Sequence, residues 1–321
     1  MEAKVLRALI FAISSVLLAG CPRAPEQATW PEWKRNPGLM PKPAGRILGE
    51  KNLAWSDERF ANFASPAAQG GALNDATSLE QQYITAADEG QVWAQTRLGL
   101  LYARAENDPL RWEKAVRLLQ LAAGQGDGEA QYELAGMAAA GRGMAASDAE
   151  AFAYMKEAAA RGMADAQYQL AAMYAAGRGT APDKVAAAEW GRRAAVQNHI
   201  PAQFSLGCLL IESVDDPTKN EGVSWLKRAA GSGSRQAALF LAAALARGEY
   251  SLAKDEVASE ALLKPLAENG DGEAQFVVAW LYMFGEKFAD RRALARDYLE
   301  MAAQGGHEQA AVALRTLPPI Q

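Results

Sequence analysis

The chain has 321 residues, of which half are hydrophobic and 22% are charged, with a formal net charge of −5. This composition excludes a disordered chain and allows either one large core or an array of small units. A mildly acidic surface of mixed charges also argues against nucleic acid as the main partner, because phosphate binding needs clustered positive charge.

The first twenty residues have the pattern of a signal peptide. Lys4 and Arg7 precede an uncharged stretch over residues 8–18, shorter than the roughly 20 residues that a membrane-spanning helix needs. The segment ends in Leu-Ala-Gly-Cys21, which resembles the lipobox of bacterial lipoproteins. The resemblance implies cleavage before Cys21 and membrane anchoring through acyl chains on this cysteine. The alternative is a plain secretory signal with an incidental cysteine.

Residue 22 bears on which membrane receives the anchor. In lipoproteins of two-membrane bacteria, aspartate after the cysteine favours the inner membrane, whereas this chain has Pro22. The resemblance therefore implies a periplasm-facing protein attached to the outer membrane.

Residues 21–55 are predicted to form an extended tether. Six prolines block helix and sheet hydrogen bonding here, namely Pro22, Pro25, Pro31, Pro37, Pro41 and Pro43. Trp30 and Trp33 also lie in this segment. They either pack on the first repeat, which we favour, or dock another protein.

From residue 56 to residue 317 the chain is predicted to repeat a pair of helices. The pattern Ala-x-x-x-(Leu/Val) recurs at intervals of 35 to 37 residues, starting at Ala94, Ala130, Ala166, Ala202, Ala237, Ala274 and Ala310. Four residues before each alanine stands a residue suited to the left-handed conformation that ends a helix: Gly90, Gly126, Gly162, Asn198, Gly233, Gly270 or Gly306. A pair of small residues, usually Ala-Ala, comes a few positions earlier.

These features predict an all-α solenoid of about six to seven helix-turn-helix units. Helix A begins at the repeat alanine, and helix B ends at the Ala-Ala pair. Stacking supplies the core, because no unit can bury its apolar face alone. Residues 56–64 and the capping box from Ser78 to Gln81 predict a degenerate first unit, and residues 318–321 a short tail.

Two stretches carry a closer resemblance. Residues 130–143 read AQYELAGMAAAGRG, and residues 166–179 read AQYQLAAMYAAGRG. They resemble the Sel-one-like repeat, a relative of the tetratricopeptide repeat, and the resemblance covers roughly residues 57–317. The Gly-x-Gly turn of this pattern is absent from the first clear unit and from the fourth, whose turns we expect to differ in shape.

Candidate catalytic and metal-binding residues are scarce. His199 and His307 occupy one repeat position three units apart, too far to share a metal ion, and we expect both to be exposed turn residues. Asp127 and Asp271 fit helix N-caps better than a cation site. Cys208 lies in an apolar helix and is expected to be buried. We therefore predict no enzyme activity, no cofactor and no metal.

A candidate binding surface follows from the register of helix A. Residues at the second and sixth positions after the repeat alanine should line a groove if the Leu-Gly or Leu-Ala pair faces the core. This stripe contains Tyr132, Tyr168, Phe204, Phe276 and Trp280. Such aromatic residues suit a bound helix or peptide. The alternative is that they pack against the neighbouring unit.

The predicted function is a non-catalytic scaffold or assembly lipoprotein of the bacterial cell envelope that binds envelope proteins along this groove. One alternative is recognition of a cell-wall glycan such as peptidoglycan, because some secreted members of the family bind cell-wall-related compounds. A hydrolase is a remote third. The sequence does not identify the partner.

Overall fold

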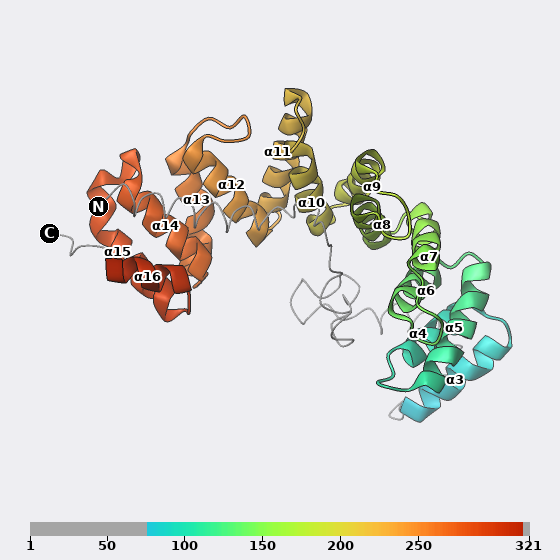
Figure 1. The fold of residues 1–321 in the computed structure, drawn as a ribbon. Helices are drawn as coiled ribbons and strands as arrows, with labels where there is room; N and C mark the ends of the chain where they lie inside the picture. The colour runs from blue at the N-terminus through green and yellow to red at the C-terminus, as the bar shows by residue number, and fades with distance from the viewer. Residues whose placement is uncertain (1–75, 317–321) are drawn as a thin grey trace, which may run out of the picture. The chain divides into compact units, whose positions relative to one another are not determined.

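A computed structural model describes residues 76–316. These residues form fourteen α-helices and one 3-10 helix, and none of them lies in a strand, which confirms the predicted all-α fold (Figure 1). The predicted signal peptide, Cys21, the tether, the helix over residues 56–64 and the tail lie outside the described residues. The described chain falls into two compact units, which divide between residues 194 and 195.

The first unit begins with a helix B and continues with three helix pairs. Its helices are α3 (Ala76–Asp88), α4 (Val92–Ala103), α5 (Pro109–Gly124), α6 (Gly128–Ala140), α7 (Asp148–Ala160), α8 (Ala164–Ala176) and α9 (Lys184–Val196), whose last residues cross the division. From α3 to α8 each helix packs against the next one in the chain, and α4 also contacts α6. The result is a stack of antiparallel helix pairs.

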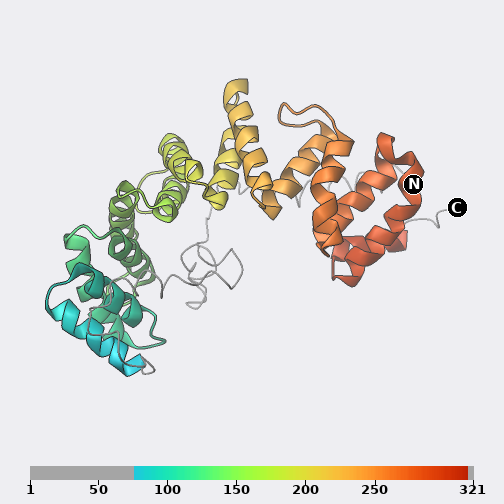
Figure 2. The ribbon, with the colours of Figure 1, turned by 180° about the vertical axis from the view of Figure 1, so that it is seen from behind.

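The second unit continues the same alternation. Its helices are α10 (Ile200–Ile211), α11 (Asp216–Gly231), α12 (Arg235–Arg247), α13 (Glu256–Glu268), α14 (Gly272–Phe284), the 3-10 helix η4 (Glu286–Arg291), α15 (Arg292–Gln304) and α16 (Glu308–Thr316). Consecutive helices again pack against each other, and α12 also contacts α14. The view from behind shows the same succession (Figure 2).

The predicted helix stops are confirmed at all seven positions. Gly90, Gly126, Gly162, Asn198, Gly233, Gly270 and Gly306 have positive φ angles, between 63° and 90°. The seven repeat alanines are at most 1% exposed. Four residues further along helix A, the repeat leucine or valine is at most 4% exposed in every helix except α16. The alternation of small and branched residues therefore builds the core between helices.

Two of the turns inside the helix pairs have the predicted Gly-x-Gly form. Gly141 and Gly177 are left-handed C-caps, and Gly143 and Gly179 also have positive φ angles. A Cβ on Gly143 would overlap the carbonyl oxygen of Trp112 at the start of α5. The Gly-x-Gly turn therefore lets the chain pass directly over the preceding helix B, as a turn and not as a phosphate-binding loop.

The first and fourth clear units lack this turn and differ in shape, as predicted. Their helices B, α5 and α11, have 16 residues, whereas α7 and α13 have 13. Gly99 and Gly207 stand in their helices A, where a Cβ would lie 2.7 Å from Leu119 Cγ and 2.6 Å from Leu226 Cγ. Glycine at this position thus allows the two helices of the pair to approach more closely.

Candidate binding surface

The structure divides the five predicted stripe residues into two groups. Phe204 and Phe276 are buried, with exposed fractions of 5% and 1%. Tyr132, Tyr168 and Trp280 are half-buried. The stripe is therefore part of the core at some helices and partly accessible at others.

Phe204 and Phe276 pack between helices, as the alternative to a groove predicted. Phe204 on α10 lies in a core cluster with Leu226 of α11 and Phe240 of α12. Phe276 on α14 lies in a cluster with residues of α15 and α16. Its ring stacks on that of His307, with centroids 4.7 Å apart and planes 22° apart. These two phenylalanines stabilise contacts between successive helix pairs.

Tyr132 and Tyr168 occupy the same repeat position on α6 and α8. Tyr132 packs beside the core cluster of α6, α7 and α8. Burial raises the pKa of the Tyr132 hydroxyl, and the charges of Asp165 and Glu133 raise it further. The hydroxyl therefore stays protonated as a hydrogen-bond donor near two carboxyl groups.

Glu133 follows Tyr132 on α6, and its side chain is half-buried. Burial raises the pKa of the Glu133 carboxyl, while the charges of Arg142 and Arg104 act in the opposite direction. Within residues 76–316 no group donates a hydrogen bond to this carboxyl. A half-buried carboxyl without a donor is costly, because its charged form has lost part of its hydration without gaining a hydrogen bond.

Glu129 stands one helical turn before Glu133 and has such a partner. Its Oε1 lies 3.3 Å from Nη1 of Arg97 on α4. Burial raises the pKa of Glu129, and the Arg97 charge opposes this rise. The two carboxyl groups of α6 therefore differ. Glu129 joins two helix pairs, whereas Glu133 accepts no hydrogen bond among the described residues.

Trp280 is the second stripe residue of α14, after Phe276, and its indole N–H lacks a hydrogen-bond partner. Its Nε1 atom is buried and has no hydrogen-bond acceptor in the described part of the chain. The ring lies 5.9 Å from that of Phe284, which is 39% exposed at the end of the same helix.

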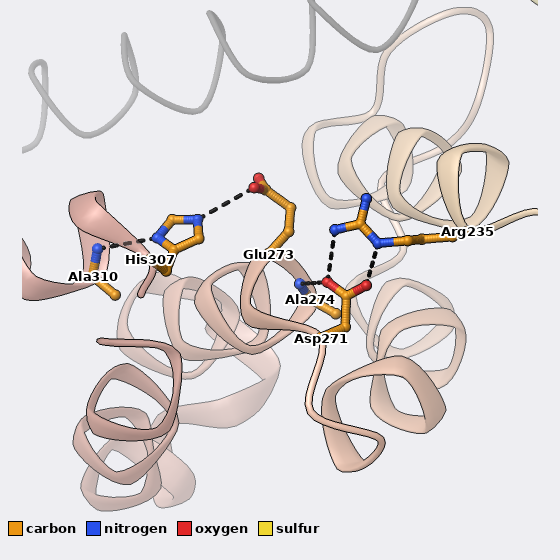
Figure 3. Close-up of polar contacts among 6 residues, drawn as sticks. All are labelled: Arg235, Asp271, Glu273, Ala274, His307 and Ala310. Carbon is orange, nitrogen blue, oxygen red and sulfur yellow. Dashed lines mark hydrogen bonds and ion pairs between the residues drawn. The ribbon is translucent and has the colours of Figure 1, made fainter. Parts of the chain in front are cut away.

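A second set of polar residues joins the N-termini of the helices A in the second unit (Figure 3). Arg235, at the start of α12, donates two hydrogen bonds to Asp271, and the bond from Nη2 to Oδ1 is 2.9 Å long. Asp271 caps α14 by accepting the Ala274 N–H at 3.0 Å, as predicted. Burial raises the pKa of Asp271, but the hydrogen bonds from Arg235 and the backbone outweigh it and hold the pKa below its ordinary value.

His199 and His307 are helix N-caps, which corrects the expectation of exposed turn residues. Nδ1 of His199 accepts the Ala202 N–H at 3.0 Å, and Nδ1 of His307 accepts the Ala310 N–H at 3.2 Å. Both histidines therefore occupy the position of Asp271. The sequence placed them in this register, but their role was missed because histidine is not among the usual N-cap residues.

No group of three or more His, Cys, Asp or Glu side chains within residues 76–316 is arranged to hold a metal ion. In the same range, no helix has the length and apolar run that crossing a bilayer requires. Cys208 is 3% exposed and lies in the core around α10, as predicted.

Comparison with known protein families identifies the repeat. The Sel1 repeat pattern matches six consecutive segments, which are residues 94–127, 128–163, 164–199, 200–234, 235–271 and 272–307. The chain belongs to the Sel1 repeat family. Helices α4 to α15 make up these six repeats, with α3 before them and α16 after them. A search among curated proteins found no significant match.

Solved structures resemble the chain to different degrees. A Sel1 repeat protein from Oxalobacter formigenes is 25% identical with a TM-score of 0.62, over 79% of this chain and 72% of that one. A protective antigen of uropathogenic Escherichia coli strains is 24% identical with a TM-score of 0.44, over 73% and 58%. An immunity protein from Pseudomonas aeruginosa is 19% identical with a TM-score of 0.36, over 72% and 88%.

One structural role found in five of the six Sel1 repeats was missed in the sequence. The residue after the repeat alanine is a buried glutamine in five helices A, at Gln95, Gln131, Gln167, Gln203 and Gln275. Each donates from Nε2 to a carbonyl oxygen eight residues earlier, in the last turn of the preceding helix B, over 2.9 to 3.4 Å. The repeated Ala-Gln dipeptide was the available signal.

Proposed function

We propose that this Sel1 repeat protein is a non-catalytic scaffold of the bacterial cell envelope that binds partner proteins through its helices A. In this proposal, lipid on Cys21 attaches it to the outer membrane, and the repeats face the periplasm. The lipobox-like segment before Cys21 supports the anchor, and Pro22 supports the choice of membrane.

The position of Glu133 beside Tyr132 carries the binding part of the proposal. The Glu133 carboxyl is half-buried, its pKa is raised by burial, and it accepts no hydrogen bond among the described residues. An arrangement that costs stability in the isolated protein is typical of a functional surface. A basic group or hydrogen-bond donor of a partner would compensate Glu133, and the rings of Tyr132 and Tyr168 would supply apolar contact area.

Affinity capture from gently solubilised membranes tests this proposal. We expect one or two envelope proteins to co-purify with the wild-type bait. The double variant Tyr132→Ala, Glu133→Gln should lose them while its melting temperature stays within a few degrees of the wild type. The matched control is Glu113→Gln, because Glu113 is an exposed residue of the helix B α5.

Two results would contradict this proposal. The first is unchanged capture by the double variant, which would contradict binding at Tyr132 and Glu133. The second is retention of the wild type on purified sacculi without any protein partner, which would favour a glycan-binding module.

The anchor has an independent test. Cys21→Ala should leave the protein unprocessed or soluble, and mass spectrometry of the wild type should find an acylated peptide that begins at Cys21. Normal membrane fractionation of the variant would contradict the proposed anchor without bearing on partner binding.

A further inference from the structure

His307 joins the start of α16 to the start of α14 (Figure 3). Its Nδ1 accepts the Ala310 N–H, and its Nε2 lies 3.2 Å from Oε2 of Glu273. Because Nδ1 acts as an acceptor, the ring that fits this geometry is neutral and carries its proton on Nε2, which donates to Glu273. The cap of α16 therefore depends on the protonation state of one imidazole.

The ring is enclosed by neighbouring groups. The side chains of His307 and Glu273 are 14% and 21% exposed. Phe276 stacks on one face of the ring, and a Cβ on Gly272 would lie 3.6 Å from the Cβ of His307. The backbone N–H of His307 also donates to the carbonyl oxygen of Ala302, at the end of α15, over 2.9 Å. The ring cannot turn freely without disturbing these contacts.

The charged groups around the ring come from three helices. Glu273 of α14 contacts it directly, and Glu308 is the first residue of α16. Arg235 of α12 interacts electrostatically with Glu273, but its hydrogen bonds go to Asp271. The contact from α15 comes from a backbone carbonyl, which carries no titratable charge. Glu273 is therefore the carboxylate placed to stabilise a protonated ring.

We propose that His307 is a proton-sensitive latch that holds α16 at neutral pH and releases it in acid. Histidine is the side chain that ordinarily changes charge between pH 5 and pH 8. Protonation converts Nδ1 from an acceptor into a second donor, which cannot bind the Ala310 N–H. It also places positive charge at a helix N-terminus, where the helix dipole disfavours it. Glu273 stabilises the imidazolium, so the ring stays on α14 while the cap of α16 is lost.

Release of α16 has a larger consequence than loss of one hydrogen bond. Ala310 and Ala313 of this helix pack in a cluster with Leu299 and Ala302 of α15, beside Trp280 of α14. A nine-residue helix is marginal without its cap. Acid would therefore expose an apolar surface at the C-terminal end of the second unit, which is a regulation separate from the proposed partner binding on α6.

Hydrogen exchange of the α16 amides, corrected for intrinsic rates, tests the latch in the full chain. We expect protection at Ala310 and over residues 312–315 to fall about fivefold or more from pH 8 to pH 5, which corresponds to the ~1 kcal/mol of a typical N-cap. The nitrogen chemical shifts of the His307 ring should also show the neutral form with its proton on Nε2 at pH 8. A histidine that only fills space would predict neither the loss of protection in acid nor this particular tautomer.

Three variants separate the latch from general acid instability. His307→Asn keeps a cap acceptor at every pH, so α16 should stay protected at pH 5. His307→Ala should show low protection at both pH values. His199→Asn, a substitution of the other histidine cap, should leave the pH dependence of α16 unchanged.

Equal protection of wild-type α16 at pH 8 and pH 5 would overturn the proposal. So would a His307→Asn variant that loses protection in acid as the wild type does. If His307→Ala does not fold, the comparison of the wild type with His307→Asn still tests whether protonation of His307 releases α16.

Discussion

Arg235 and Asp271 are one repeat length apart, and the guanidinium of one holds the carboxylate of the other through two hydrogen bonds. The same carboxylate caps α14. The Asp271 side chain thus caps α14 and also connects its N-terminus to the N-terminus of α12. The Asp271 side chain is 13% exposed, whereas that of Arg235 is 53% exposed.

We expect Asp271→Ala to lower the free energy of unfolding by about 1.5–2 kcal/mol, because it removes both the cap and the ion pair. Asp127→Ala is the matched control, since Asp127 caps α6 by accepting the Ala130 N–H. It should cost only the ~1 kcal/mol of a cap. Chemical denaturation of both variants measures the difference, and equal losses would show that Arg235 contributes nothing.

The same residue predicts a pH dependence. The pKa of Asp271 is held below its ordinary value, so its contribution to stability is present above the ordinary range of an aspartate and is lost as pH falls through the lowered pKa. Asp271→Asn keeps a cap acceptor without the titration. The wild type should therefore lose more stability than Asp271→Asn between pH 5 and pH 2 in denaturation experiments, and parallel curves would contradict this.

Gly143 should be among the least replaceable residues of the turns. Its φ is 69°, and a Cβ would overlap the Trp112 carbonyl oxygen. Gly143→Ala should cost about 2–4 kcal/mol, from backbone strain and overpacking together. Gly162 has a φ of 90° but nothing within 4 Å of a Cβ, so Gly162→Ala should cost only ~1 kcal/mol. If thermal unfolding shows that both variants lose the same stability, the contact between a Cβ at residue 143 and the Trp112 carbonyl oxygen does not matter.

The periodic features of the fold could be predicted because each depends on local backbone conformation. Gly90 and Asn198 stop helices for reasons that are visible in a few residues of sequence, and Ala130 is buried wherever the repeat places it. The same local reasoning identified Asp127 and Asp271 as N-caps. These features do not depend on which surfaces meet in three dimensions.

The candidate site was less predictable because it depends on packing between helices. Phe276 and Tyr132 share one repeat position, yet a neighbouring histidine covers the first, and the second is half-buried beside carboxyl groups. His307 could be recognised as a cap only from the orientation of its ring, since histidine caps a helix only when neutral. Gln275 reaches a carbonyl across a turn, a contact that hydrophobic periodicity does not report.

Gln275→Met tests the contribution of the buried glutamines. The Nε2 atom of Gln275 donates to the Ala267 carbonyl oxygen at 2.9 Å, and the side chain is 6% exposed. Methionine keeps the length but cannot donate, so the Ala267 carbonyl oxygen keeps only the bond from the Gly270 N–H at 3.1 Å. We therefore expect a loss of about 0.5–1.5 kcal/mol in the free energy of unfolding. Gln169→Met, at a half-buried position of α8, should change it by less than ~0.5 kcal/mol. A similar small effect of both would show that the repeated bond does not stabilise the stack.

Glu133→Gln should stabilise the isolated protein, in contrast to the other substitutions. The pKa of Glu133 is raised by burial, so its charged form costs stability, and that cost appears as pH rises from the ordinary range of a glutamate through the raised pKa. A neutral amide removes it. The melting temperature of Glu133→Gln should exceed that of the wild type at pH 7, and the difference should shrink towards pH 4. A lower melting temperature at pH 7 would mean that Arg142 and Arg104 already compensate the carboxylate, and Glu133 would then be structural and not the position that a partner completes.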